Sequence, residues 1–165
     1  MGSGRVRQVW KDLGDGAYEV EEFEESAEGP RWREGWRLAL GPEGLVHLGA
    51  IPRSGSFEPW DPPWTVLPAV VRSGPVSSGV HRRGEREVER VADIIPSSIP
   101  GGVTVVSDTR GGPARIVMRD HFVPDFGWAG FEGLILRPTG QLRVWSEDVV
   151  VDGVAAPTAP EDTDA

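Results

Sequence analysis

Phe131-Glu-Gly-Leu-Ile-Leu-Arg-Pro-Thr-Gly-Gln-Leu-Arg-Val-Trp145 is the stretch of sequence that decides the fold. It predicts two strands, Gly133 to Arg137 and Gln141 to Trp145. In both segments apolar residues alternate with other residues, and this period of two is typical of a strand that buries one face. Pro138 pre-sets the φ angle of a turn, and Gly140 accepts the positive φ with which such a turn joins the second strand. The stretch therefore predicts a β-hairpin. Its alternating apolar residues are Leu134, Leu136, Leu142 and Val144.

A second stretch, about Trp36 to Ile51, repeats this pattern. Pro42 and Gly44 stand where Pro138 and Gly140 stand in the first hairpin, and four apolar residues match at the same offset. A duplicated half-domain would produce this likeness. Two unrelated hairpins with the same turn chemistry would produce it as well, and this simpler interpretation is favoured.

Short strand-like segments separated by turn signals follow one another along most of the chain. This succession predicts a single, mainly β domain over residues 1–153, an antiparallel β-barrel or β-sandwich built from hairpins. Residues 73–83 are predicted as a loop. Residues 154–165 are predicted as a disordered acidic tail, because they hold too few apolar side chains to fold.

One short α-helix is predicted within this β domain, from Glu85 to Ile95. Four apolar residues recur there at intervals of three and four, which places them in one stripe on a helix surface. Pro96 follows and would end the helix. The stripe consists of Val88, Val91, Ala92 and Ile95.

The predicted core takes one face from each proposed element. Leu136→Ala is therefore expected to cost about 2 to 5 kcal/mol of stability, the usual result of truncating a buried leucine. The predicted core residues are Leu38, Leu40, Val46, Leu48, Val88, Val91, Ile95, Val103, Val105, Ile116, Met118, Leu134, Leu136, Leu142 and Val144.

The composition of the 165-residue chain argues against several classes of protein. A formal net charge of −9 at pH 7 would repel nucleic-acid phosphates before local contacts formed. The chain has no cysteine, which excludes disulfides and thiolate metal sites. No apolar run is long enough for a signal peptide or a membrane span. A cytoplasmic protein is therefore predicted, or a virion component if the chain is a phage structural protein, with no cofactor, nucleic acid or membrane as a partner.

Arg119-Asp120-His121, with Asp125 close behind, is the densest polar group in the sequence. A carboxylate of Asp120 or Asp125 that orients His121 would make that histidine a general base. The favoured interpretation is that Asp120 and His121 are turn residues at a strand end, because no nucleophile or oxyanion donor accompanies them. The histidines are also too widely spaced to predict a metal site. They are His47, His81 and His121.

Seven tryptophans bring large ring surfaces that stack on sugars or on the side chains of a partner. Two aromatic loops are predicted as the functional surface, the proline-rich segment Ser54 to Trp64 and the segment His121 to Trp128. Proline disfavours a regular ladder or helix in the first of them, and long loops often carry function. The same rings would alternatively close the end of a barrel. The predicted binding residues are Phe57, Trp60, Asp61, Trp64, Phe122, Phe126 and Trp128.

Three functions are consistent with these features. The leading hypothesis is a non-enzymatic interaction or structural module that contacts a protein partner or sister subunits through its aromatic loops, such as a subunit of a virion or another large assembly. The first alternative is a β-barrel that binds a small ligand or a carbohydrate on tryptophan platforms. The second alternative is a hydrolase that uses His121 and Asp120 as an acid–base pair.

Overall fold

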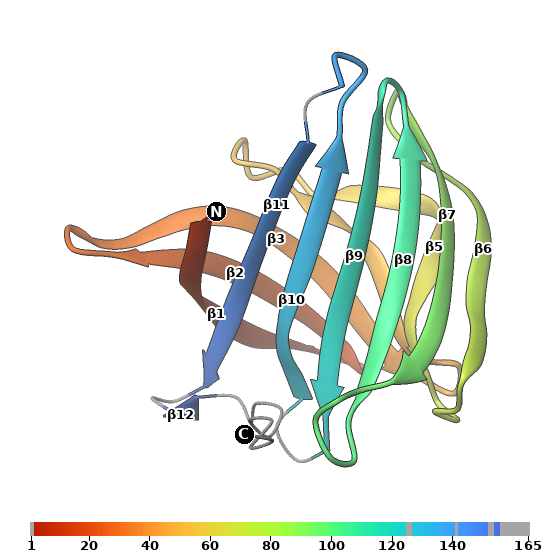
Figure 1. Ribbon diagram of the computed structural model, residues 1–165, viewed down its shortest axis with the longest axis horizontal. Helices are drawn as coiled ribbons and strands as arrows, with labels where there is room; N and C mark the ends of the chain where they lie inside the picture. Colours follow the sequence, from red (N-terminus) through yellow and green to blue (C-terminus); the bar gives the residue numbers. More distant parts are fainter. Residues whose placement is uncertain (1, 125–126, 141, 152–153, 156–165) are drawn as a thin grey trace, which may run out of the picture.

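The structure is a computed structural model. It describes the backbone of residues 2–124, 127–140, 142–151 and 154–155, and the side chains of residues 6–124 and 127–140. These residues contain no helix and form strands joined by short turns (Figure 1). In chain order the strands are β1 (Gly2–Gly14), β2 (Ala17–Ser26), β3 (Gly29–Gly41), β4 (Gly44–Ile51), β5 (Glu58–Pro68), β6 (Gly74–Arg83), β7 (Arg86–Pro96), β8 (Val103–Gly111), β9 (Ala114–Val123), β10 (Gly127–Leu136), β11 (Leu142–Val151) and β12 (Val154–Ala155).

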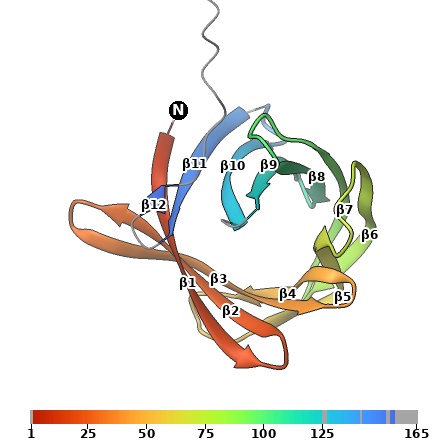
Figure 2. The same cartoon turned by 90° about the horizontal axis from the view of Figure 1, so that it is seen from below.

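The strands form one sheet that closes on itself. Each strand pairs with the next strand along the chain, and a parallel pairing between β1 and β11 joins the two sides. Figure 2 shows the strands arranged around a ring, from which the hairpin of β2 and β3 projects. The predicted mainly β, antiparallel fold is confirmed, and its form is a curled, barrel-like sheet.

The hairpin predicted from Gly133 to Trp145 forms, as strands β10 and β11. Leu134 pairs with Val144 and Leu136 with Leu142 across β10 and β11. Gly140 has a φ of 79°, and its N–H donates to the carbonyl of Arg137 over 2.9 Å. In the earlier hairpin Gly44 also has a positive φ, of 111°. Local turn chemistry therefore fixes both registers.

The predicted helix from Glu85 to Ile95 is wrong, because this segment is strand β7. Buried residues alternate with exposed ones along it, and the buried set is Val88, Arg90, Ala92 and Ile94. A period of two buries one face of a strand, and in a sheet that closes on itself this face lies inside. We call it the inner face. Arg90 interrupts the apolar alternation, and for that reason the sequence resembles a helical stripe.

The apolar core occupies the inner face where Ala92, Ile94 and Val105 pack together, with Leu67 and Val76 against them. Leu38, Val88 and Val105 are buried as predicted. Four predicted core residues are instead exposed, among them Leu136 at 42%. On β10 the inner face carries Phe131, Gly133 and Ile135, so the apolar alternation of the hairpin was assigned to the wrong face. The four exposed residues are Leu40, Val91, Ile95 and Leu136. The side chains of Leu142 and Val144 lie outside the described part of the chain.

The sheet has a weak seam between β5 and β6. Asp61 opposite Arg82 is the one backbone pair that joins these two strands. β5 contains four prolines, and proline has no N–H to donate to a ladder. The proline-rich segment predicted as a loop is therefore a strand from Glu58 onward, but a strand with little hydrogen bonding to β6. The predicted loop at residues 73–83 is likewise wrong, because most of it is β6.

A disulfide across this seam is expected to stabilise the protein. Asp61→Cys combined with Arg82→Cys places two thiols at directly opposed, exposed positions, where antiparallel strands bring Cα atoms within disulfide range. Closing a loop of about 20 residues should raise the free energy of unfolding by about 3 kcal/mol. Urea unfolding of the oxidised and reduced double variant measures the gain, and Asp61→Cys alone is the control. A double variant that oxidises without any gain would contradict the opposed placement of the two residues.

Candidate functional site

A cluster of aromatic and cationic side chains lies on the inner face of β4 to β7. Residues opposite one another on antiparallel strands project to the same face, and the pairing of His47 with Trp64 begins the set. The neighbouring strands β6 and β7 complete it across the seam. We call these residues the inner cluster, and they are His47, Trp60, Trp64, His81, Arg83 and Arg90.

Trp64 is the centre of the inner cluster. The His47 ring stacks on it with 4.7 Å between ring centroids. The Trp60 ring lies at 4.7 Å on a tilted plane, and the His81 ring meets it edge-on at 5.2 Å. Side-chain contacts from β5 to β6 therefore hold the seam where backbone hydrogen bonds are missing.

Arg90 is a buried cation in this cluster. Its guanidinium lies 5.2 Å from the centroid of the Trp64 ring, and Nη1 donates a hydrogen bond to Ser77 Oγ over 3.0 Å. Its exposure is 6%, and it forms no ion pair with any carboxylate of the described residues. Burial lowers the pKa of the guanidinium to about 10. The negative charge of Asp120 acts in the opposite direction and raises this pKa. Arg90 thus remains charged at neutral pH, and no carboxylate in the described part of the chain forms an ion pair with it.

Arg83 is the second cation of the cluster and is better compensated. Its guanidinium lies over the Trp60 ring at 4.8 Å, and its Nε atom is 3.2 Å from Glu58 Oε2. Burial lowers its pKa, as does Arg86, while Glu58 and Glu34 raise it. The contact with Glu58 is an ion pair without hydrogen-bond geometry, since Arg83 Nε has no hydrogen-bond partner.

Several enclosed polar atoms of the inner cluster lack a partner. His81 Nδ1 lies 2.6 Å from the carbonyl oxygen of Pro62, and because a carbonyl only accepts, this nitrogen carries the proton. The other nitrogen of a neutral His81 ring is then a free acceptor. The pKa of His47 falls to about 3, first through burial and then through the charges of Arg90 and Arg83, so this ring is neutral. The enclosed atoms without a hydrogen-bond partner are His47 Nδ1, Trp60 Nε1, His81 Nε2 and Arg83 Nε.

Asp120 forms a second polar group on the inner face, at β9. Its Oδ1 accepts a hydrogen bond from Trp128 Nε1 over 3.0 Å, and the Trp128 ring stacks on Phe131 at 5.6 Å. Burial raises the pKa of Asp120 to about 6, against the hydrogen bond from Trp128 and the charges of Arg90 and His121. Burial shifts the pKa values of both Asp120 and His47, yet each residue keeps part of its surface accessible. Water can therefore reach these two residues.

The predicted acid–base pair is not brought together. Asp120 and His121 are consecutive residues in the middle of the β8–β9–β10 pairing, so their side chains point to opposite faces. His121 Nδ1 lies 2.8 Å from Thr104 Oγ1, and Nε2 lies 3.4 Å from Glu132 Oε1. Thr104 is only 3% exposed, which leaves no path for a substrate carbonyl to its hydroxyl. Asp125 lies outside the described residues.

The predicted binding residues are divided between the two faces. Trp60 and Trp64 belong to the inner cluster, and Trp128 contacts Asp120. Phe57 instead lies under the guanidinium of Arg37, at 4.4 Å from it. Among the described residues no hydrogen bond, ion pair or ring contact joins the first predicted loop to the second. Phe122 packs beside the apolar core, Asp61 is exposed, and Phe126 lies outside the described residues.

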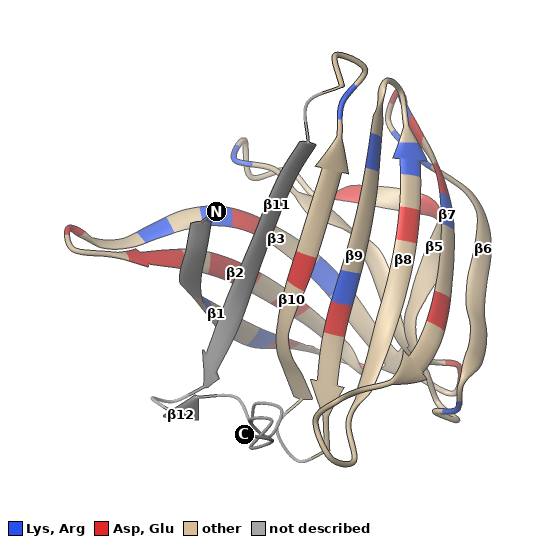
Figure 3. Ribbon diagram, in the orientation of Figure 1, with Lys and Arg blue, Asp and Glu red and all other residues tan. Residues whose placement is uncertain are grey.

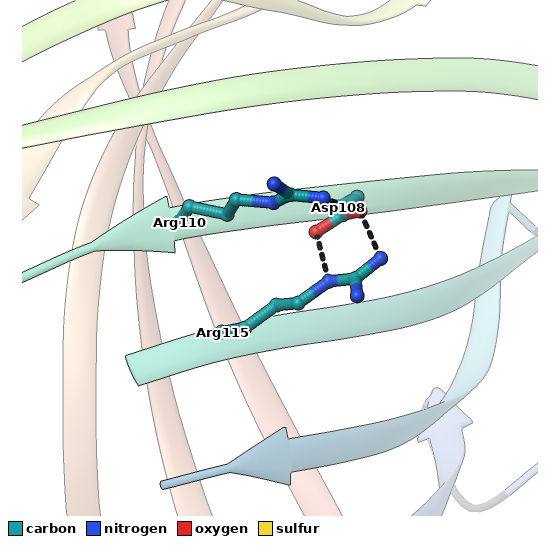
Figure 4. Close-up of polar contacts among 3 residues, drawn as sticks. All are labelled: Asp108, Arg110 and Arg115. Carbon is teal, nitrogen blue, oxygen red and sulfur yellow. Dashed lines mark hydrogen bonds and ion pairs between the residues drawn. The ribbon is translucent and has the colours of Figure 1, made fainter. Parts of the chain in front are cut away.

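Two features of the outer face are separate from the inner cluster. A shallow hollow of about 480 Å³ lies beside Trp32 and Arg53, with Glu19 and Glu21 in its lining. On β8 and β9, Asp108 accepts two hydrogen bonds from Arg115, with Arg110 nearby (Figure 4). Basic and acidic segments are interspersed along β7 to β10 (Figure 3). Exposed ion pairs of this kind contribute little, and we regard both features as parts of a solvated surface.

Little in the sequence predicts the inner cluster. His81, Arg83 and Arg90 stand among further arginines in one basic stretch of the sequence, and a charged stretch is typical of a solvated surface. One signal was available, because Val88, Arg90, Ala92 and Ile94 fit a period of two with a single charged member. A charge at a buried position of a strand points to a function or a special partner.

Comparisons with protein-family models, with curated proteins and with solved structures found no match for this chain. In the described part of the chain no group of three or more acidic or histidine side chains is arranged to hold a metal ion. The same residues include no helix with the length and apolar character needed to cross a membrane.

Proposed function

We propose that this protein is a non-enzymatic binding domain that holds a small organic ligand against the inner cluster. The supporting observation is the inner cluster itself, in which aromatic rings lie beside a buried cation and four enclosed polar atoms have no hydrogen-bond partner. An enclosed polar atom without a partner costs about 1 to 3 kcal/mol. Costly polar groups that a fold keeps enclosed are typical of functional sites.

The platform suits a flat ligand. The Trp64 ring lies 4.7 Å from the Trp60 ring and 4.7 Å from the His47 ring, measured between centroids. Trp64 and His47 keep part of their surface accessible, and a flat molecule gains contact area on aromatic rings at a small cost in entropy. Ligand sites typically combine aromatic walls with a few polar groups that fix orientation. The inner cluster has both components.

The placement of the rings favours this hypothesis over contact with a protein partner through the same tryptophans. Trp60 is 6% exposed, and the Trp64 ring is covered by Trp60, His47 and His81. A partner on the outside of the sheet would not reach either ring. Trp64 keeps part of its surface accessible, so a small ligand on the inner face would contact Trp64 while Trp60 stays buried.

Replacement of Trp64, the central ring of the cluster, is expected to weaken ligand binding. A library of small planar compounds is screened against the protein by ligand-observed NMR, and the affinity of each hit is then measured by calorimetry. Trp64→Leu should weaken the hits by about tenfold or more, since loss of an aromatic anchor typically costs about 2 kcal/mol. Trp10→Leu is the matched control, because Trp10 is 47% exposed and lies outside the cluster. A library without hits, or hits that ignore Trp64→Leu, would refute the proposed function.

A further inference from the structure

We infer that the ligand of the inner cluster is an aromatic monocarboxylate whose carboxylate binds Arg90. This inference rests on the proposed function and specifies the class of ligand. Its basis is a buried guanidinium that forms no ion pair among the described residues.

The charges of the inner cluster do not balance around Arg90. Arg83 has Glu58 at 3.2 Å, and His47 is neutral. Arg90 has one hydrogen bond, to the uncharged hydroxyl of Ser77, and a ring face at 5.2 Å. Asp120 acts on it through its charge alone, with no ion pair between them among the described contacts.

An unpaired buried charge is costly, and the cost falls when an anion of good geometry arrives. A guanidinium offers a planar fork of N–H donors that matches the two oxygens of a carboxylate. Arg90 uses only Nη1 on Ser77 among the described residues. The remaining donors of its fork are therefore available to a ligand.

The ion pairing of Arg90 determines which ligand charge the site favours. Among the described residues Arg90 has no carboxylate at ion-pair distance, and Asp120 acts on it only through its charge, so a single carboxylate beside the guanidinium completes an ion pair. Asp120 already brings a negative charge to the inner face, and a dianion such as a phosphate monoester would add two more where like charges repel. A monocarboxylate is the planar monoanion that fits the fork.

The rings around Arg90 select the rest of the ligand. Arg90 lies over Trp64, and Arg83 lies over the adjacent Trp60. Trp60 is buried, whereas Trp64 keeps part of its surface accessible. An aromatic acid whose carboxylate reaches Arg90 can therefore place its ring against Trp64.

A pair of isosteric probes tests the class of ligand without any mutation. Indole-3-carboxylate and the neutral indole-3-carboxamide are titrated into the wild-type protein at neutral pH, with calorimetry as the readout. The carboxylate should bind about tenfold to a hundredfold more tightly, which is the usual worth of a charge-assisted hydrogen-bond pair. Equal affinity for the two probes would overturn the inference and leave the proposed function standing. Binding of neither probe would overturn the inference, and the library screen with Trp64→Leu then decides the proposed function by itself.

A matched pair of arginine variants locates the carboxylate. Arg90→Met should remove the preference for the carboxylate and retain binding of the carboxamide. Arg82→Met removes the same charge from the neighbouring strand, at an exposed position that faces outward and pairs with Glu87, and should retain the full preference. A preference that survives Arg90→Met would overturn the role of Arg90.

The thermal stability of the free protein provides a further check on Arg90→Met. Replacing a buried, unpaired charge by an apolar side chain of similar length is neutral or stabilising, so the midpoint of thermal unfolding should stay level or rise. Arg90→Lys keeps the charge and loses the fork, and it should retain only part of the preference. If Arg90→Met fails to fold, Arg90→Lys and the two probes still decide the question.

Discussion

Replacement of Asp120 by Asn is expected to make the stability of the protein fall steeply as the pH drops from about 6.5 to 4. Two enclosed groups titrate in this range with opposite consequences. The pKa of Asp120 is raised from 3.8 to about 6, and that of His47 is lowered from 6.5 to about 3. Each tenfold difference in proton affinity between the folded and unfolded states is worth about 1.4 kcal/mol.

The two contributions have opposite signs. The folded protein holds a proton on Asp120 more tightly than the unfolded chain does, so this group stabilises the fold below pH 3.8 and loses that effect as the pH rises through 6. His47 behaves the other way, because the unfolded chain takes up its proton first. Its contribution is present above pH 6.5 and is lost as the pH falls toward 3. The full effects are about 3 kcal/mol for Asp120 and about 5 kcal/mol for His47.

Between pH 6 and 4.5 the two slopes nearly cancel in the wild-type protein. Asp120→Asn removes the contribution that offsets His47. The free energy of unfolding should then drop by about 3 kcal/mol as the pH falls from about 6.5 to about 4. His47→Phe keeps a ring against Trp64 and leaves Asp120 uncompensated, so stability should rise on acidification. Urea unfolding at a series of pH values measures both profiles as differences from the wild type.

An exposed carboxylate supplies the control for this experiment. Asp61→Asn removes a charge at the surface, and its profile should run parallel to the wild-type profile. Asp120→Asn and His47→Phe should instead diverge from the wild type in opposite directions. Profiles that remain parallel in all three variants would show that neither inner group is enclosed as described.

The hairpins were predictable because their determinants are local. A proline and a glycine at a fixed spacing specify the turn, and the turn specifies the register. The buried face was not predictable in the same way. Leu134 and Leu136 form a more apolar row than Phe131, Gly133 and Ile135, yet the second row faces inward. Gly133 lowers the apparent hydrophobicity of the inward row. The outward row, which is more apolar, is therefore mistaken for the buried one.

The inner cluster was hidden for a related reason. β6 directs Ser77, Gly79, His81 and Arg83 inward, and Val76 is the β6 side chain that packs against the apolar core. Because most of its enclosed face is polar, the segment reads as a loop. In β7 the inward Arg90 breaks the alternation in the same way. Functional residues often violate the patterns that specify a fold. Here the polar residues of the candidate site are the ones that disguised the two strands.

Ile94→Ala is expected to cost about 2 to 5 kcal/mol of stability, the usual range for truncating a fully buried isoleucine. Ile94 is 2% exposed and packs with Ala92 and Val105 in the apolar core. Leu136→Ala, at an exposed position, should cost less than about 1 kcal/mol. Urea unfolding at neutral pH measures both free energies.

Ile95→Ala is the matched control for Ile94→Ala, because it removes the same atoms one residue along the chain. Ile95 is 39% exposed on the outer face, and its truncation should also cost less than about 1 kcal/mol. A helix from Glu85 to Ile95 would bury Ile95 in its apolar stripe and leave Ile94 outside it, so the order of the two effects would be reversed. The ranking of two neighbouring isoleucines therefore distinguishes the strand from the helix. It also tests the inward direction of Arg90, which lies four residues before Ile94 on the same face of β7.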